Sequence, residues 1–275
     1  MQVTIVANKR AQGVDSALPS ILAALAEIGV QCILPPPDLD FLSEEMDAYI
    51  AQGDVVVALG GDGTMIHTAK RAAAYGKAVL GINCGRLGFM AGIERHELEH
   101  LKRLLDGQYT VEKRMMLDVS VVRDGRTITE RTALNESVVS RGMLSRMLRL
   151  EVQNGEKTVI CYQADGVILS TPTGSTAYSL SAGGPIIDPA LNCILMTPVC
   201  PHSLHARSYI FDQSARLEVR VFEEAALLTI DGEETIELQP GDAVVVKDAA
   251  QEAQLIKLKP MRFYDVLNEK LMNRK

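Results

Sequence analysis

The chain has 275 residues, 47% of them hydrophobic, which is enough for one large domain or two smaller ones with a sizeable core. Its net charge of −7 argues against a nucleic-acid-binding surface, because such a surface needs clustered Lys and Arg, but it leaves phosphorylated small molecules open. With no apolar stretch of membrane-spanning length, no basic leader and five scattered cysteines, we expect a cytoplasmic protein with no membrane partner.

Strand and helix patterns alternate through the first hundred residues. This order predicts a Rossmann-like α/β domain in which a parallel sheet is connected by right-handed crossovers. The predicted strands are residues 2–8, 30–34, 55–59 and 78–83, and the predicted helices are 18–28, 41–51, 65–74 and 94–105.

A glycine-rich turn follows the apolar strand at 55–59 and consists of Gly60, Gly61, Asp62, Gly63 and Thr64. Such a corner between a strand and a helix is where open α/β sheets bind ligands. Glycines let backbone N–H groups approach a phosphate, and the helix N-terminus favours negative charge. The ionisable Asp62 could hold a metal ion or take a proton from an attacking hydroxyl. The alternative is a tight turn in which Asp62 caps the helix.

A second glycine-rich loop follows the strand at 78–83 and spans residues 84–92. Its three glycines indicate a contorted backbone, and Phe89 among them favours a ring-stacking or lid role. A long surface loop is the alternative.

Strands dominate from Tyr109 onward, with hairpin turns at Asp124-Gly125, Asn154-Gly155 and Asp231-Gly232. We therefore expect an α/β domain at 1–108 and a β-rich domain at 109–261. A helix at 263–272, within a tail of residues 262–275, could pack back onto the first domain. The predicted strands are 116–123, 127–132, 138–140, 148–153, 159–163, 166–170, 193–197, 215–222, 226–230, 235–238 and 243–247.

A long run of hydroxyl and glycine residues follows the strand at 166–170 and leads into a predicted helix start. This uncharged, donor-rich loop suits a ribose, an amide or a phosphate, whereas the alternative is a helix cap at Ser175 or Thr176. Upstream, Asn135-Glu136 interrupts an apolar pattern and is either an exposed pair or a grip on a ribose diol.

The glycine turn Gly60-Gly61-Asp62-Gly63-Thr64 resembles the phosphate loop shared by phosphofructokinases, lipid kinases and NAD kinases. Together with Asn135-Glu136, Asp165-Gly166 and the Thr-Pro-Thr-Gly-Ser-Thr-Ala-Tyr run at 171–178, the chain resembles the NAD kinases. These motifs occur in that family's order and approximate spacing, and the resemblance covers the whole chain. The run at 171–178 separates this family from the other two.

The resemblance implies transfer of the γ-phosphate of ATP, or of polyphosphate in some members, to the 2′-hydroxyl of the adenosine ribose of NAD. It implies Asp62 as the catalytic base and Gly60, Gly61, Gly63 and Thr64 as the ATP phosphate-binding residues. The NAD-binding residues that we carry over are Asp62, Gly63, His67, Phe89, Asn135, Glu136, Arg146, Gln163, Asp165, Thr173, Thr176, Ala177, Tyr178, Ser179 and Ser181.

The resemblance also implies a homodimer or homotetramer, because sites in this family are completed across subunits. We expect a divalent cation such as Mg²⁺ to be bound through ATP, with no metal ligand in the protein predicted directly. A zinc site at Cys200, His202 and His205 is a weak alternative, since no fourth ligand is evident. The rival functions are a kinase for another polyol or lipid and a catalytically silent NAD-binding regulator.

Overall fold

The computed structural model describes all residues except 86–87, 143–145, 204–205, 223–225, 261–262 and 273–275. It divides into two compact units, which are Met1–Lys113 with Ala253–Lys275 and Arg114–Glu252. Among the helices of the described residues, none is long and apolar enough to span a membrane.

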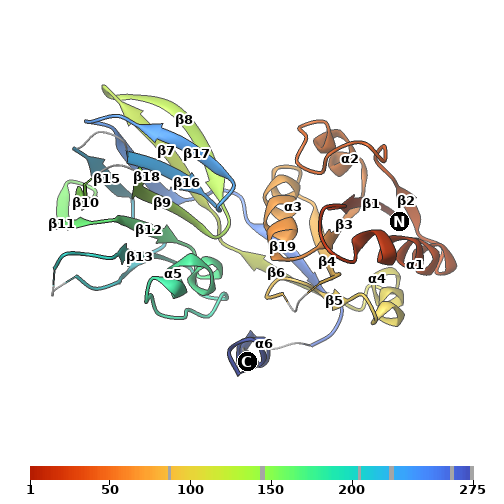
Figure 1. The fold of residues 1–275 in the computed structure, drawn as a ribbon. Coiled ribbons are helices and arrows are strands. Elements are labelled where there is room, and N and C mark those ends of the chain that lie inside the picture. Colours follow the sequence, from red (N-terminus) through yellow and green to blue (C-terminus); the bar gives the residue numbers. More distant parts are fainter. Residues whose placement is uncertain (86–87, 143–145, 204–205, 223–225, 261–262, 273–275) are drawn as a thin grey trace. The chain divides into compact units, whose positions relative to one another are not determined.

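The first unit is built on a sheet of seven strands in the order β2-β1-β3-β4-β19-β6, with β5 paired to β4 (Figure 1). The pairs from β2 to β19 are parallel, as the alternation of strands and helices predicted. All six residues of β3 are buried, which its unbroken apolar sequence requires. The strands are β1 (Gln2–Ala7), β2 (Gln31–Ile33), β3 (Val55–Gly60), β4 (Ala78–Asn83), β5 (Ile93–Glu94), β6 (Thr110–Arg114) and β19 (Ala253–Lys257).

Helices α1 and α3 begin four and three residues earlier than predicted, and two larger differences occur in this unit. Helix α2 begins at Met46 rather than at 41, because the Arg71 guanidinium takes the carbonyl oxygens of Phe41 and Ser43 that a helix would use. The single helix predicted at 94–105 is wrong. The Arg95 N–H donates to the Asn83 carbonyl, so the chain first extends along β4 as β5. The helices are α1 (Val14–Glu27), α2 (Met46–Gln52), α3 (Asp62–Ala74), the 3-10 helix η1 (Leu98–Leu101), α4 (Lys102–Leu105) and α6 (Phe263–Met272).

The second unit contains two antiparallel sheets of six strands each, in the orders β11-β10-β15-β18-β7-β8 and β14-β13-β12-β9-β16-β17. Alternate residues of both sheets form one core, as in a β-sandwich. The strands are β7 (Leu117–Arg123), β8 (Arg126–Ala133), β9 (Glu136–Arg141), β10 (Leu148–Asn154), β11 (Lys157–Ala164), β12 (Gly166–Ser170), β13 (Cys193–Val199), β14 (Tyr209–Asp212), β15 (Leu217–Val221), β16 (Ala226–Ile230), β17 (Glu234–Leu238) and β18 (Ala243–Asp248). Two short helices, η2 (Thr173–Thr176) and α5 (Tyr178–Ser181), follow β12.

The chain returns to the first unit before its end. The sequence placed residues 253–261 in the β-rich domain, whereas β19 pairs with β4 in the parallel sheet of the first unit. Strands β5, β6, β14 and β19 were not predicted, because each is a short segment that becomes a strand only against a partner strand. The tail helix has the predicted bounds and belongs to the first unit.

Candidate active site

The glycine turn lies at the carboxyl end of β3, where the chain enters α3. A side chain at Gly60 would place its Cβ 2.3 Å from the Thr64 Oγ1 atom, so only glycine fits there. By contrast, a Cβ at Gly61 or Gly63 would meet nothing within 4 Å. The backbone of these two glycines therefore faces open space at the N-terminus of a 13-residue helix, which suits an approaching phosphate.

The Asp62 carboxylate is held by the second glycine loop. Its Oδ2 accepts the Phe89 N–H at 3.1 Å, and its Oδ1 accepts the Met90 N–H at 3.2 Å. The helix-capping alternative is wrong, because Gly61 is the N-cap of α3 and no side chain caps that end. The two glycine-rich loops, at residues 60–64 and 84–92, thus meet at this carboxylate.

The tail helix α6 reaches the same carboxylate. The Lys270 Nζ lies 3.0 Å from Asp62 Oδ2 and 3.9 Å from the centroid of the Phe89 ring, and Phe89 also contacts Phe263. From their place near the end of the chain, Lys270, Arg274 and Lys275 are expected to be solvated, and the contact with Asp62 corrects this expectation for Lys270. Arg274 and Lys275 lie outside the described residues.

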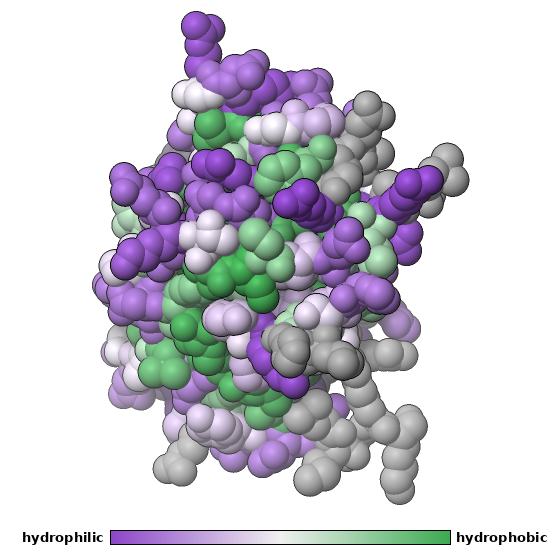
Figure 2. Space-filling view, turned by 90° about the vertical axis from the view of Figure 1, so that its left-hand side faces the viewer, coloured by the Kyte–Doolittle hydropathy of each residue, from purple (hydrophilic) through white to green (hydrophobic). Residues whose placement is uncertain are grey.

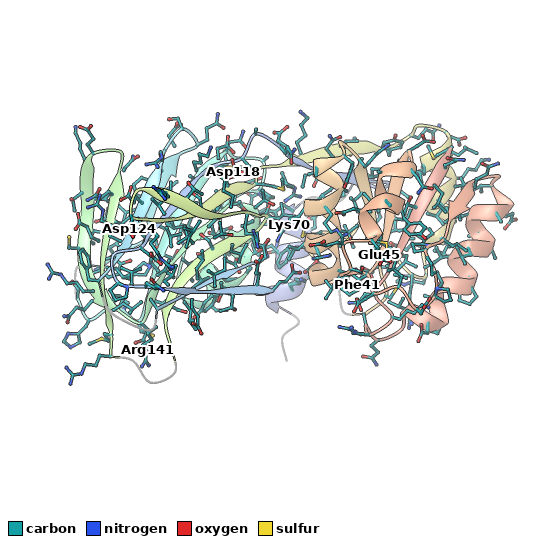
Figure 3. The ribbon with its side chains drawn as sticks, turned by 90° about the horizontal axis from the view of Figure 1, so that it is seen from above. Phe41, Glu45, Lys70, Asp118, Asp124 and Arg141 are labelled. Atoms are coloured by element: carbon teal, nitrogen blue, oxygen red, sulfur yellow. The ribbon has the colours of Figure 1, made fainter. Side chains whose placement is uncertain are left out.

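His67 lies one turn into α3 but faces the segment that precedes α2. Its ring meets Phe41 edge to face at 5.6 Å, and its Nε2 lies 3.4 Å from an Arg71 guanidinium nitrogen. Phe41 and Lys70 mark this region in Figure 3. Arg71 in turn binds Asp47 at 2.6 Å. His67 is therefore packed among protein groups rather than simply solvated.

In the second unit, Glu136 and Ser170 are directly opposite each other on β9 and β12, so their side chains share one face of the sheet. Both are buried, and Glu136 Oε2 and Ser170 Oγ have no hydrogen-bond partner within the described part of the chain. Burial, together with the nearby Asp231 carboxylate, raises the pKa of Glu136 to about 8. Buried polar atoms without a protein partner are rare, so a bound water or an external ligand would supply the missing hydrogen bonds.

The hydroxyl-rich run covers this face of the sheet. Ser179 of α5 hydrogen-bonds Thr197 of β13 at 2.8 Å, and Ser175 accepts the Ile187 N–H at 3.0 Å. Gly174 packs against the Asn135 backbone so closely that a Cβ would lie 2.1 Å from the Asn135 carbonyl oxygen. No side chain caps η2 or α5, so the helix-cap alternative for Ser175 and Thr176 is wrong.

The predicted site residues of the second unit fall into two groups. Asn135, Glu136 and the run at 173–181 gather at the carboxyl end of β12. Asp165, Gln163 and Arg146 lie beyond its amino end, and a strand of five residues separates the two ends by about 13 Å. Asp165 there binds Arg141, which Figure 3 labels, at 2.8 Å.

The described residues hold no group of three or more His, Cys, Asp or Glu side chains that could bind a metal ion. Of the weak zinc alternative, His205 lies outside the described residues. The described residues therefore provide no candidate metal site made of protein side chains.

Three functional candidates were missed in the sequence. Asn8 directly follows β1 at the same sheet edge as the glycine turn, and its Nδ2 donates to Thr64 Oγ1 at 3.0 Å. The order of the strands in the sequence could have indicated this position. Lys270 contacts Asp62, and the Asp231 carboxylate accepts the backbone N–H groups of residues 134–136. The partners of both residues are far away in the sequence, so no local pattern predicts either contact.

Comparison with known proteins gives a consistent result. Residues 8–112 match the family model described as ATP-NAD kinase N-terminal domain, and residues 134–258 match the ATP-NAD kinase C-terminal domain. The NAD kinase of Symbiobacterium thermophilum is 49% identical over 79% of this chain and 78% of its own. The NAD kinase of Ruminiclostridium cellulolyticum is 36% identical over 93% of this chain and 92% of its own.

Two solved structures share the fold. Yeast NADH kinase in complex with NADH superimposes with a TM-score of 0.89 at 26% identity, covering 100% of this chain and 88% of that one. An NAD kinase from Archaeoglobus fulgidus in complex with ATP has a TM-score of 0.78 at 24% identity, with 99% of both chains covered.

Proposed function

The chain belongs to the NAD kinase family, and from this we propose that it transfers the γ-phosphate of ATP to the 2′-hydroxyl of the adenosine ribose of NAD, giving NADP. The observation that carries the proposal is the Asp62 carboxylate, fixed by two backbone N–H groups beside two glycines that face open space.

Asp62 is the general base of this proposal. An alcohol is almost fully protonated at neutral pH, so its oxygen attacks phosphorus well only if a neighbouring group accepts the proton. A positioned carboxylate contributes about 10²–10⁴-fold to such a step. The proton moves from the ribose 2′-oxygen to an Asp62 oxygen as the new P–O bond forms and the bond between the β-phosphate oxygen and the γ-phosphorus breaks.

The ATP phosphates bind at Gly60, Gly61, Gly63 and Thr64. The backbone N–H groups of this turn and the α3 N-terminus supply positive potential without a charged side chain. A divalent cation such as Mg²⁺ accompanies ATP and neutralises its charge when bound. Because the described residues offer no cluster of ligands, we assign it to the phosphates and to no protein residue.

NAD binds to the remaining predicted residues. Asn135 and Glu136 hold a ribose diol, which would supply the missing partners of Glu136 Oε2 and Ser170 Oγ. Thr173, Thr176, Ala177, Tyr178 and Ser181 surround the adenine and ribose, and Gly63, His67 and Phe89 of the first unit are the other predicted NAD-binding residues. Ser179, also among the predicted NAD-binding residues, is fully buried and its hydroxyl is hydrogen-bonded to Thr197. Its role is therefore to hold the hydroxyl-rich run in place.

Asp165, Gln163 and Arg146 cannot join Glu136 in one small site, since they lie at the other end of β12. We therefore assign them to a site completed by a second subunit of a homodimer or homotetramer. Hydrophobic side chains gathered on one face of the second unit support such an assembly (Figure 2), and Leu191 and Ile210 of this unit are 56% and 59% exposed.

The acceptor and donor are tested together. NAD and NADH are each incubated with ATP and Mg²⁺, and also with polyphosphate in place of ATP, and the phosphorylated dinucleotide is measured. Diacylglycerol and a free polyol serve as control acceptors. Phosphorylation of the dinucleotide alone supports the proposal. Phosphorylation of the lipid or the polyol, or NAD binding without turnover under either donor, contradicts it.

A further inference from the structure

Asp231, at the turn between β16 and β17, binds the backbone of the segment that carries Asn135 and Glu136. Its Oδ2 accepts the Leu134 N–H at 3.0 Å, and its Oδ1 accepts the N–H groups of Asn135 and Glu136 at 2.8 and 3.0 Å. The Asp231 N–H donates to the Glu136 carbonyl at 2.9 Å. Four hydrogen bonds thus join one turn residue to three consecutive residues 95 to 97 positions away.

The turn itself does not require this carboxylate. The hairpin between β7 and β8 has the same Asp-Gly pair, with Asp124 at φ 50° and Gly125 at φ 73°, against 49° and 71° for Asp231 and Gly232. Asp124, labelled in Figure 3, is exposed, and its carboxylate accepts no hydrogen bond among the described residues. The two turns share the positive-φ Asp-Gly pair, although the β7–β8 loop has two residues and the β16–β17 loop has three, and they differ in what their Asp residue binds.

The opposite side of the same segment is bound by the hydroxyl-rich run. The Thr171 N–H donates to the Asn135 carbonyl at 2.9 Å, and the Thr171 hydroxyl donates to the Leu134 carbonyl at 2.6 Å. With these contacts, each backbone N–H and C=O group of Leu134, Asn135 and Glu136 has a hydrogen-bond partner within the protein. What the segment offers a ligand is its side chains, and Glu136 Oε2 is the buried atom without a partner.

Consecutive backbone N–H groups that converge on one anion form a nest. Here the nest is filled by a carboxylate of the protein itself, so the local backbone is fixed before any ligand arrives. Hydrogen bonds to a charged acceptor are roughly twice as strong as neutral ones. Such preorganisation lowers the entropy cost of binding.

We propose that Asp231 is a positioning residue for NAD: it fixes the backbone at 134–136 so that Asn135 and Glu136 meet the ribose diol, and it does not touch NAD itself. This inference rests on the proposed role of Asn135 and Glu136 as NAD ligands. Burial is the larger cause of the raised pKa of Glu136, and the Asp231 carboxylate, the charged group that acts on it among the described residues, raises that pKa further.

The experiment compares Asp231→Asn and Asp231→Gly with Asp124→Asn as the matched control. Asn and Gly both tolerate positive φ, so each variant keeps the turn. Asn retains one acceptor oxygen, whereas Gly retains none. At about pH 9, where Glu136 is largely ionised, we expect the KM for NAD to rise about tenfold in Asp231→Asn and further in Asp231→Gly. The kcat and the KM for ATP should stay within about twofold, and Asp124→Asn should match the wild type.

A pH profile separates positioning from a general structural role. Ribose hydroxyls donate to the ionised carboxylate, so kcat/KM for NAD in the wild type rises with pH through about 8. Removing the Asp231 charge eases ionisation of Glu136, and the rise should move to lower pH in Asp231→Asn. Thermal melting of all variants checks that the fold is intact.

The outcomes separate this inference from the proposed function. Asn135→Ala and Glu136→Gln are measured in parallel. If both raise the KM for NAD while the two Asp231 variants change neither the KM nor the profile, the positioning role is overturned and the NAD site stands. If Asn135→Ala and Glu136→Gln leave the KM for NAD unchanged, the NAD site is misassigned and the positioning role falls with it.

Discussion

At the residue scale, two carboxylates with opposite surroundings define the chemistry. Asp62 accepts two backbone N–H groups and lies beside the Lys270 ammonium. Glu136 is buried, lacks a partner at one oxygen and lies near the carboxylate of Asp231. Because their surroundings differ, the two carboxylates take different roles: Asp62 accepts a proton, and Glu136 binds hydroxyl groups.

The raised pKa of Glu136 predicts a pH-dependent stability. The stabilising contribution of its neutral form is complete below the unfolded value of 4.5 and is lost as pH rises towards the folded value of about 8. Relative to Glu136→Gln, the free energy of unfolding of the wild type should fall by up to roughly 4 kcal/mol across that window. Urea denaturation at pH 5 and at pH 8.5 measures this difference, and parallel behaviour of the two proteins would refute it.

At the element scale, the loop between β4 and β5 supplies the two N–H groups that orient Asp62. A Cβ at Gly88 would lie 2.4 Å from Asp62 Oδ1, whereas a Cβ at Gly85, in the same loop, would meet nothing within 4 Å. Gly88→Ala should therefore displace the carboxylate and lower kcat at least about tenfold, since small misplacements of a reacting group are costly. Gly85→Ala is the matched control and should stay within about twofold. Equal turnover of the two variants would show that this loop does not orient Asp62.

The strands and helices could be predicted where their cause is local. The β3 run, the Asp-Gly hairpin turns and the bounds of α6 all follow from neighbouring residues. The helix predicted at 94–105 failed because the Asn83 carbonyl and the Glu97 side chain draw residues 94 and 95 into an extended path. Strand β19 was missed because its partner β4 lies more than 170 residues earlier in the sequence.

Much of the candidate site could be proposed from motif order, since Asp62, Glu136 and the hydroxyl-rich run each stand out in the sequence. Their supports could not be proposed in the same way. Asp231 looks like any other Asp-Gly turn residue, and Lys270 like any exposed tail lysine. Each acquires its role from a contact made by the fold, so no spacing in the sequence marks it.

At the scale of the whole molecule, the separation of Asp165 from Glu136 bears on how complete one chain is. If each active site takes Asp165 from a second subunit, Asp62→Asn and Asp165→Ala can complement each other in one assembly. Co-expression of the two inactive variants should restore activity to about a quarter of the wild type, because about half of randomly paired dimers are mixed and a mixed dimer has one intact site in two. Each variant expressed alone is the control. Activity no greater than the sum of these controls would place Asp165 in its own chain's site or outside any site.

The central claim is that this chain phosphorylates NAD with Asp62 as the base. Its most direct test is NADP formation from NAD, ATP and Mg²⁺, read with an NADP-specific dehydrogenase, for the wild type and Asp62→Asn side by side. We expect turnover by the wild type and a loss of about 10²–10⁴-fold in the variant, with unchanged melting temperature and NAD binding. Near-normal turnover by Asp62→Asn would remove Asp62 as the base, and absence of turnover in the wild type would contradict the assigned reaction.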